Sequence, residues 1–246
     1  EAVAEHHYDP QFLAVAGYTF PVTNRLLIEA DASRSEYYRN QKRIPGTGFD
    51  TISVTDQGLD LEYGSRGNTQ PGYQVFDDDR FHERVGVSYI TGSHNFKVGL
   101  DLNQFSGGRK NYSDANLVNQ AISYTFRDRV PNTVTIHNTP NGPYNTATEN
   151  NVYAQDQWTV RKLTLNLGVR YSVYDATVPA AHLPAGPYVP ARDFPELKHS
   201  PHWQNLSPRL GAAYDLFGTG RTALKVSLGR YPIRNGGAAV NIPATD

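Results

Sequence analysis

The 246-residue sequence contains no cysteine and no methionine. The lack of cysteine excludes disulfides, thiolate nucleophiles and cysteine-ligated zinc. Long apolar runs are also missing, because no window approaches the roughly 18 uninterrupted apolar residues that a membrane-spanning helix needs. Spanning helices are therefore excluded. Spanning β-strands are not, because they alternate apolar with polar residues and so average to a hydrophilic composition.

The charge of the chain is balanced, with 23 basic residues, 24 acidic residues and a formal net charge of -1. A nucleic-acid-binding surface normally shows a basic excess or a stripe of Lys and Arg, and the sequence has neither. We therefore expect no nucleic acid partner. The chain begins at Glu1 without a charged and then apolar leader, so we expect a processed chain or an internal piece of a longer one.

The clearest pattern in the chain is an alternation with a period of two, which predicts a β-strand with one apolar face. The best example covers residues 163–171, and residues 95–103 and 224–228 repeat it. We expect the apolar members to face lipid or a partner and the polar members to face a wet interior. In the best example the apolar members are Leu163, Leu165, Leu167, Val169 and Tyr171, and the others are Thr164, Asn166, Gly168 and Arg170.

Weaker alternation predicts seven further strands and brings the total to about ten, with uncertain boundaries. The connections between them alternate between short turns and long segments rich in Pro, Gly and Asn. Outer-membrane barrels have short periplasmic turns and long extracellular loops, so this alternation favours a barrel wall over a soluble sandwich. The weaker strands are expected at 11–20, 26–38, 75–89, 120–128, 133–138, 151–159 and 207–217. The short turns are expected at 21–24, 91–94, 130–132, 160–162 and 218–220, and the long connections at 39–72, 107–119, 139–150 and 176–206.

Residues 151–171 read Asn-Val-Tyr-Ala-Gln-Asp-Gln-Trp-Thr-Val-Arg-Lys-Leu-Thr-Leu-Asn-Leu-Gly-Val-Arg-Tyr. This segment resembles a recurring hairpin in the barrel of TonB-dependent outer-membrane receptors, and most closely that of the Oar-like group. A second segment, 206–221 with its continuation at 229–231, and a third at 93–101 are similar to hairpins of the same family. The second begins Leu-Ser-Pro-Arg-Leu-Gly-Ala-Ala-Tyr-Asp.

The resemblance implies a parent protein with a barrel of about 22 strands, an internal plug and a periplasmic segment that contacts TonB. No plug or TonB-contacting segment is recognisable in this sequence, and it does not end in the terminal aromatic strand of a complete barrel. We therefore expect residues 1–246 to form one incomplete segment of an all-β, antiparallel up-and-down barrel of about ten strands.

The resemblance also implies a function, which is the binding and import of an extracellular solute by the intact parent in the bacterial outer membrane. The wall would contact membrane lipid, and TonB would be reached only through parts outside this chain. Recognition usually lies in loops on a rigid scaffold. The aromatic candidates for ligand contact are Tyr37, Tyr38, Tyr112, Tyr144, Tyr188 and Trp203, and the alternative is that they only pack the loops together.

Two histidine groups could hold a metal ion. His199 and His202 flank a proline in a Pro-rich loop, with Asp193 and Glu196 upstream, and imidazole with carboxylate is a common zinc donor set. The favoured interpretation is that these histidines are ordinary loop residues without a metal. His6-His7 offers no more, so we expect neither a metal site nor a cofactor.

An acidic run could mark a calcium or catalytic site. Asp77, Asp78 and Asp79 offer hard oxygens, but consecutive residues of a strand point to alternate faces, so a solvated charge run is the favoured interpretation. Asp77, Asp79 and His82 could also serve an outer-membrane protease. No catalytic motif accompanies them, and we expect no enzyme activity.

The rival interpretation is structural. Strands cut from a closed wall leave two free edges, and free edges invite pairing with another chain. Such a piece could close into a smaller barrel, aggregate, or add to copies of itself as an extracellular tube or filament. The sequence does not choose among these outcomes.

Overall fold

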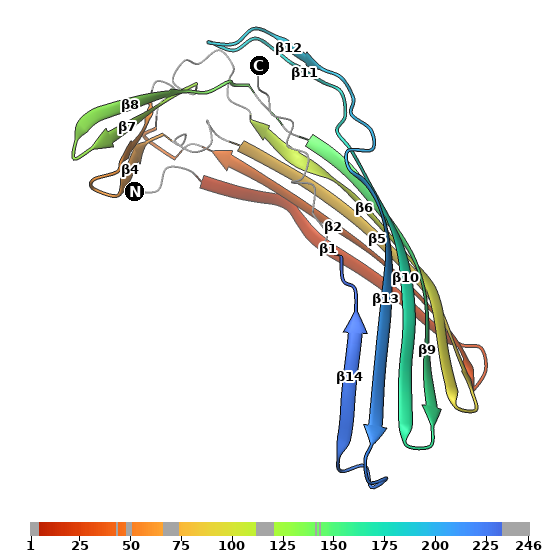
Figure 1. The fold of residues 1–246 in the computed structure, drawn as a ribbon. Helices are drawn as coiled ribbons and strands as arrows, with labels where there is room; N and C mark the ends of the chain where they lie inside the picture. Colours follow the sequence, from red (N-terminus) through yellow and green to blue (C-terminus); the bar gives the residue numbers. More distant parts are fainter. Residues whose placement is uncertain are drawn as a thin grey trace.

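The computed structural model describes residues 5–42, 44–47, 51–65, 74–111, 121–140, 142 and 144–232. Strands, turns and irregular segments account for all of this part, which contains no helix. None of the described residues therefore forms a helix of the length and apolarity needed to cross a membrane. The strands make three sheets, with eight, four and two members (Figure 1).

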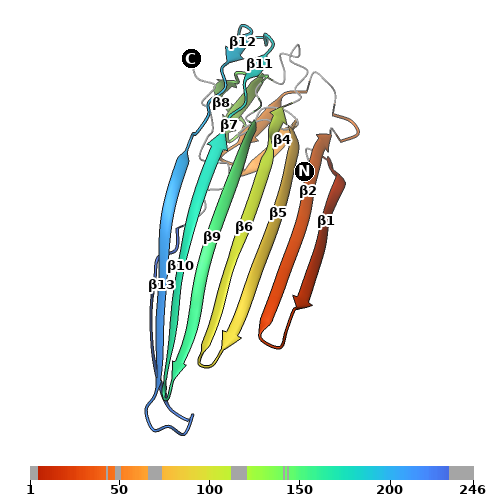
Figure 2. The same cartoon turned by 90° about the vertical axis from the view of Figure 1, so that its right-hand side faces the viewer.

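The eight-stranded sheet is antiparallel and runs β1-β2-β5-β6-β9-β10-β13-β14. Its long strands lie side by side in Figure 2, and we call this sheet the wall. The wall confirms eight of the ten predicted strands, most of them several residues longer than the apolar alternation indicates. Its strands are β1 (Glu5–Pro21), β2 (Leu26–Lys42), β5 (Gln74–Thr91), β6 (His94–Asn111), β9 (Tyr144–Val160), β10 (Leu163–Thr177), β13 (His202–Asp215) and β14 (Ala223–Gly229).

The wall has a turn end and a loop end (Figure 2). Four short turns, at 22–25, 92–93, 161–162 and 216–222, join successive wall strands at the turn end, which confirms four of the five short turns. In the two-residue turns, Gly92 (φ 54°) and Arg161 (φ 52°) adopt the left-handed conformation that tight hairpins favour. All the long connections emerge at the loop end.

Two smaller sheets lie at the loop end (Figure 1). We call the four-stranded one, β4-β3-β7-β8, the loop-end sheet. The expectation that 120–128 and 133–138 are wall strands joined by a turn-end turn is wrong, because they become β7 and β8 of this sheet. β3 also pairs with β7 in parallel. The six short strands are β3 (Ser53–Asp56), β4 (Leu61–Gly64), β7 (Ile122–Arg127), β8 (Val130–Ile136), β11 (Ala181–Leu183) and β12 (Arg192–Phe194).

The physical reason for the error is that period-two alternation reports a one-sided strand but not the sheet to which it belongs. The four short strands β3, β4, β11 and β12 were not expected at all. With three or four residues each, they are too short to show a period.

The wall has one apolar and one polar face. Residues paired across antiparallel strands share a face, so the register traces each face from strand to strand. Tyr171 pairs with Val152 and Leu206, and Val152 pairs with Leu100. One residue away, Arg170 pairs with Tyr153 and Ser207. The register therefore confirms the predicted division of strand 163–171 into Leu163, Leu165, Leu167 and Val169 on one face and Asn166, Gly168 and Arg170 on the other.

The apolar face is largely uncovered by the described chain. Its band on β10, from Leu163 to Tyr171, measures about 26 Å along the strand, or about 20 Å along the membrane normal at a tilt of about 40°. That height is comparable with the apolar belt of roughly 25 Å on outer-membrane barrels. Exposed fractions of 47% to 72% are found at Val98, Leu100, Val152, Leu206, Leu210, Val226 and Leu228.

The wall is open. Among the described residues no pairing joins β1 to β14, so each presents an unpaired edge. The buried apolar residues gather at the loop end, where the wall strands meet the long connections. They are Val75, Ala121, Ala147, Ala176 and Val178.

Candidate functional site

A hydrogen-bonded network of charged and polar side chains lies on the polar face of the wall. Asn151, which is only 1% exposed, donates from its amide to Asp101 Oδ1 at 3.1 Å, and the Arg170 Nε–H donates to Asn151 Oδ1 at 3.1 Å. The Arg170 guanidinium also lies 3.7 Å from Asp101 and 3.9 Å from Glu149. Three strands, β6, β9 and β10, are thus joined through side chains as well as backbone.

The network continues toward β2 through two more ion pairs. Arg84 Nη2 lies 2.6 Å from Asp31, and Lys97 Nζ lies 2.5 Å from Glu29. His82 lies 3.4 Å from Asp101 on the same face. Since charged groups are costly in hydrocarbon, this face requires water or a polar partner.

A shallow depression of about 290 Å³ opens within this network. The Tyr153 ring lies against Gly99 of β6, the neighbouring strand, and its hydroxyl reaches Gly86 of β5. Tyr153 also lines the depression. Its charged lining consists of one acid, Asp101, and four cations, Arg84, Lys97, Arg170 and Arg209. Arg84, Lys97 and Arg170 are each paired with a carboxylate. Such a surface can hold an anionic or strongly polar group.

The aromatic residues proposed for ligand contact do not gather in one place. Tyr37 and Tyr38 lie within β2, where their side chains alternate between the two faces, because β2 runs to Lys42 and the expected loop begins later. Tyr144 is the first residue of β9, and Trp203 lies in β13. Tyr188 lies between β11 and β12, and Tyr112 lies outside the described residues.

Two of these aromatics make ring contacts. Tyr37 meets Tyr8 edge to face, with 5.9 Å between ring centres. Trp203 stacks on Tyr174 of β10 at 5.5 Å. Both contacts lie near the loop end, and a contact of either ring with a ligand stays a prediction.

The residues considered for a protease site are not brought together. In β5 the side chains of Asp77 and Asp79 share one face, and that of His82 lies on the opposite one. Asp79 forms a bidentate pair with Arg34, at 2.9 and 3.3 Å. The separation follows from the period of two, since His82 is an odd number of residues from each acid.

The loop that returns to β13 is fixed against the end of β10 by four backbone hydrogen bonds. The Ser200 N–H donates to the Ala176 carbonyl at 2.8 Å, and the Ala176 N–H donates to the Pro201 carbonyl at 3.0 Å. Farther out, Val178 and Leu197 exchange two bonds of 2.9 Å. Because Ala176 and Val178 are 1% and 3% exposed, these bonds are sheltered and the loop has a defined path.

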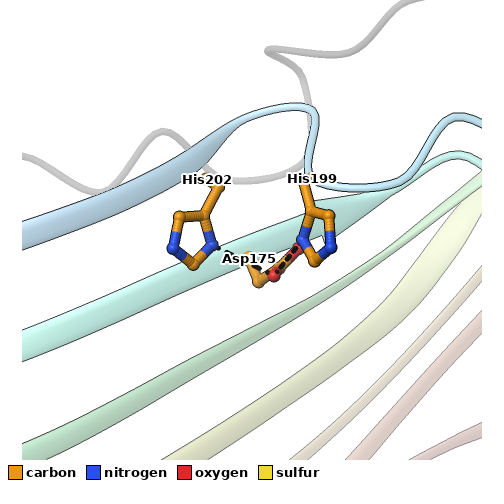
Figure 3. A group of neighbouring side chains, drawn as sticks. All are labelled: Asp175, His199 and His202. Carbon is orange, nitrogen blue, oxygen red and sulfur yellow. Dashed lines mark hydrogen bonds and ion pairs between the residues drawn. The ribbon is translucent and has the colours of Figure 1, made fainter.

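This path brings His199 and His202 to Asp175, the residue before Ala176 (Figure 3). His199 Nδ1 lies 2.6 Å from Asp175 Oδ2, and His202 Nδ1 lies 3.1 Å from the same oxygen. The three ligand-type atoms lie within 4.8 Å of one another. Two imidazoles and a carboxylate that meet in this way can coordinate a transition ion. The histidines singled out from the sequence are thus joined by Asp175, and not by Asp193 or Glu196.

The other nitrogen of His202 is also engaged. Its Nε2 lies 3.2 Å from the Gln204 amide nitrogen, and the Tyr171 hydroxyl donates to Gln204 Oε1 at 2.9 Å. Two side chains in series, Gln204 and Tyr171, therefore orient the His202 ring. A second pair, His182 and Asp193 at 2.6 Å, joins β11 to β12, and no third ligand-type residue of the described chain joins it in a metal-sized group.

An acid on the apolar face was not expected. Asp156 pairs with Phe96 and Leu167 in the register, close to the turn end, and its Oδ2 lies 2.7 Å from His94 Nδ1. The His94 ring is stacked between Phe96 and Trp158, at 5.1 and 5.2 Å. Alternation back from Trp158 could have placed Asp156 on this face.

A second unexpected carboxylate joins two hairpins of the loop-end sheet. Asp56, 1% exposed, accepts backbone N–H bonds from Gly58 (3.0 Å), Leu59 (3.2 Å), Asp128 (2.9 Å) and Arg129 (2.6 Å). Burial of the carboxylate tends to raise its pKa, but the four donors outweigh that effect and hold the pKa of Asp56 below its usual value. No sequence pattern signals this arrangement, because the two turns are far apart in the chain.

Comparison with known families agrees with this architecture. Residues 4–245 match the family model described as outer membrane beta barrel domain. The search of curated proteins gave no match. The match covers nearly the whole chain, including all the strands of the wall and of the smaller sheets. The chain belongs to the outer membrane beta barrel domain family.

Proposed function

We propose that this chain forms part of the barrel wall of a TonB-dependent receptor of the Oar-like type, which binds and imports an extracellular solute. The observation that carries the proposal is the charged network on the polar face, directly behind the exposed apolar band. A wall with these two faces separates lipid from a wet interior.

The orientation follows from the cost of burying charge. Arg84, Lys97 and Arg170 with their acidic partners would face hydrocarbon if the wall were reversed, and each charge would lose its hydration. With the polar face inward, the same groups meet water or the surface of an internal domain. The resemblance to TonB-dependent receptors supports a plug as that domain, and under this proposal the TonB contact would lie outside this chain.

Solute recognition would take place on the polar face and at the loop end. The depression lined by Arg84, Lys97, Arg170 and Arg209 suits an anionic or strongly polar group, and Tyr37 and Trp203 offer aromatic surfaces nearer the loop end. We propose no catalytic step for these residues, because recognition and passage need only reversible contacts.

The proposal is tested by comparing cells that make the full-length protein with cells that lack it. Mass spectrometry of the spent medium should reveal a solute that only the first cells deplete, and a protonophore should abolish that depletion. Tyr37→Ala should slow the depletion, whereas Tyr38→Ala, the neighbour on the opposite face, serves as a matched control. A full-length protein in the outer membrane with no energy-dependent depletion of any solute would contradict the proposal.

A second candidate function rests on the open edges of β1 and β14. Unpaired strands can add to copies of the same chain and build a tube or filament. Negative-stain images of the purified chain in detergent-free buffer distinguish the two functions. Long regular tubes would favour assembly, whereas discrete particles seen only in detergent would favour a membrane wall.

A further inference from the structure

We propose that Asp175, His199 and His202 bind a divalent first-row transition ion, with zinc as the reference ion, at the loop end of the wall. Two imidazole nitrogens and one carboxylate oxygen form a donor set that zinc, nickel and copper prefer. All three donors come from one continuous piece of structure, the end of β10, the returning loop and the start of β13.

The distances fit an ion with little rearrangement. Around tetrahedral zinc, with zinc–nitrogen distances of about 2.1 Å, neighbouring ligand atoms lie about 3.4 Å apart. The two His Nδ1 atoms now lie 2.6 and 3.1 Å from Asp175 Oδ2, and all three ligand atoms fall within 4.8 Å. Small rotations of the two imidazole rings make room for an ion at their centre.

The backbone around His199 has a defined conformation. His199 has φ of 56°, a left-handed conformation that His, like Asn and Asp, adopts more often than most other L-residues. The backbone bonds of Ser200 and Ala176 hold it there. In this conformation the imidazole lies beside Asp175, with Nδ1 2.6 Å from Oδ2.

The neighbours of His202 resemble the outer shell of a metal site. Metal-bound histidines usually have their second nitrogen fixed by a hydrogen bond, which sets the tautomer. Gln204 occupies that position beside His202 Nε2, and Tyr171 in turn holds Gln204. In the present arrangement the Gln204 amide nitrogen donates to His202 Nε2, and the His202 proton lies on Nδ1, toward Asp175. When an ion binds at Nδ1, the Gln204 amide must turn over, so that its oxygen accepts from Nε2–H and its nitrogen donates to the Tyr171 hydroxyl.

The position of the site defines what an ion would do there. Asp175 lies four residues beyond Tyr171, about 13 Å along the strand from the edge of the apolar band, so external ions reach it. Asp175 lies on the same face of β10 as Tyr171 and pairs with His202, whereas the depression is on the opposite, polar face. The two sites share no residue, so the metal-site inference does not depend on solute uptake. A bound ion would link β10 to the returning loop and would leave at least one coordination position open.

The test uses the full-length protein in detergent micelles. Isothermal calorimetry should show one Zn²⁺ bound per chain in this region, and Co²⁺ should give a visible absorption band that Zn²⁺ displaces. His202→Ala should weaken Zn²⁺ affinity at least tenfold, as should His199→Asn, because Asn tolerates the left-handed backbone. Gln204→Ala should weaken it by about tenfold. His182→Ala removes the histidine of the His182–Asp193 pair and should leave the Zn²⁺ affinity unchanged.

Circular dichroism confirms that each variant retains its strands, so that lost binding is not lost folding. Copper supplies an independent readout, since electron paramagnetic resonance of bound Cu²⁺ should show coupling to two imidazole nitrogens in the wild type and to one in either histidine variant. The proposal is overturned if the wild type binds none of these ions, or if both histidine variants bind them as the wild type does.

Discussion

The wall and the loop-end sheet are both β-structure, but they are stabilised in different ways. In the wall, strands of up to 18 residues pair over most of their length and follow one rule, apolar on one face and polar on the other. In the loop-end sheet, strands of four to seven residues form only short backbone ladders, and the Asp56 carboxylate adds bonds that hold its two turns together. The stability of the wall therefore depends on the medium that each face meets, and the stability of the loop-end sheet depends on a few specific hydrogen bonds.

This difference determines how each region responds to change. A substitution on the apolar face of the wall should change stability through contact with lipid, and the identity of the neighbouring side chains should matter little. A change in the loop-end sheet matters only where a particular donor or acceptor is lost. Paired substitutions in the two regions should therefore separate an effect of face from an effect of single hydrogen bonds.

The largest effect is expected from a charge on the apolar face of the wall. Val98→Arg should destabilise the full-length protein in lipid bilayers by about 2–4 kcal/mol, because Arg near the bilayer midplane of a barrel loses its hydration. Gln155→Arg places the same side chain on the polar face and should change stability by less than about 0.5 kcal/mol. Urea unfolding in vesicles measures both. Equal losses would show that the two faces do not differ in environment.

The wall could be predicted from the sequence because its rule is local. Residues 163–171 and 95–103 show the alternation directly, and the chemistry of a lipid-facing surface requires it. The ends of the strands could not be predicted, because pairing continues past the apolar band while the alternation of hydropathy fades. β2 runs on to Lys42 and β6 to Asn111 for this reason, so that residues 39–42, expected in a long connection, belong to a strand.

A somewhat smaller effect is expected where Tyr153 crosses two glycines on the polar face. A Cβ on Gly99 would lie 2.5 Å from the Tyr153 hydroxyl oxygen and 2.6 Å from the Val85 carbonyl oxygen. Gly99→Ala should therefore cost about 1–3 kcal/mol, the usual range for overpacking. Gly168→Ala is the matched control, because its nearest atom would be at 3.6 Å. The same urea unfolding measures both, and equal stability of the two variants would contradict the close packing of Tyr153.

The loop end could be predicted only in part. The pattern correctly marked β7 and β8 as strands but not the sheet to which they belong, because the parallel pairing with β3 is set by residues about 70 positions away. For the candidate metal site, the sequence offered His199 and His202 as a pair. Asp175 precedes them by more than 20 residues, and only the register of β10 with β13 brings it to them.

Removal of the Asp56 carboxylate should loosen the loop-end sheet and leave the wall intact. Asp56→Ala leaves four backbone donors without their acceptor, so hydrogen exchange at Gly58, Leu59, Asp128 and Arg129 should accelerate by roughly tenfold or more. Amides of β6 and β9 in the wall should exchange at the wild-type rate. Mass spectrometry of peptides from both regions makes the comparison, and acceleration throughout the chain would show that the two regions unfold together.

The smallest effect expected is a loss of the same protection in acid. The pKa of Asp56 is lowered in the folded protein, so the stabilisation is fully present above the unfolded pKa of about 3.9 and is lost as the pH falls through the folded value. Between neutral pH and about pH 4, the four turn amides should keep constant protection, after correction for the intrinsic exchange rate. Below that range their protection should fall. Asp56→Asn carries no charge and should lack this step, whereas Asp60→Asn, in the same turn, should retain it. An acid step that survives in Asp56→Asn would assign the pH dependence to another carboxyl group.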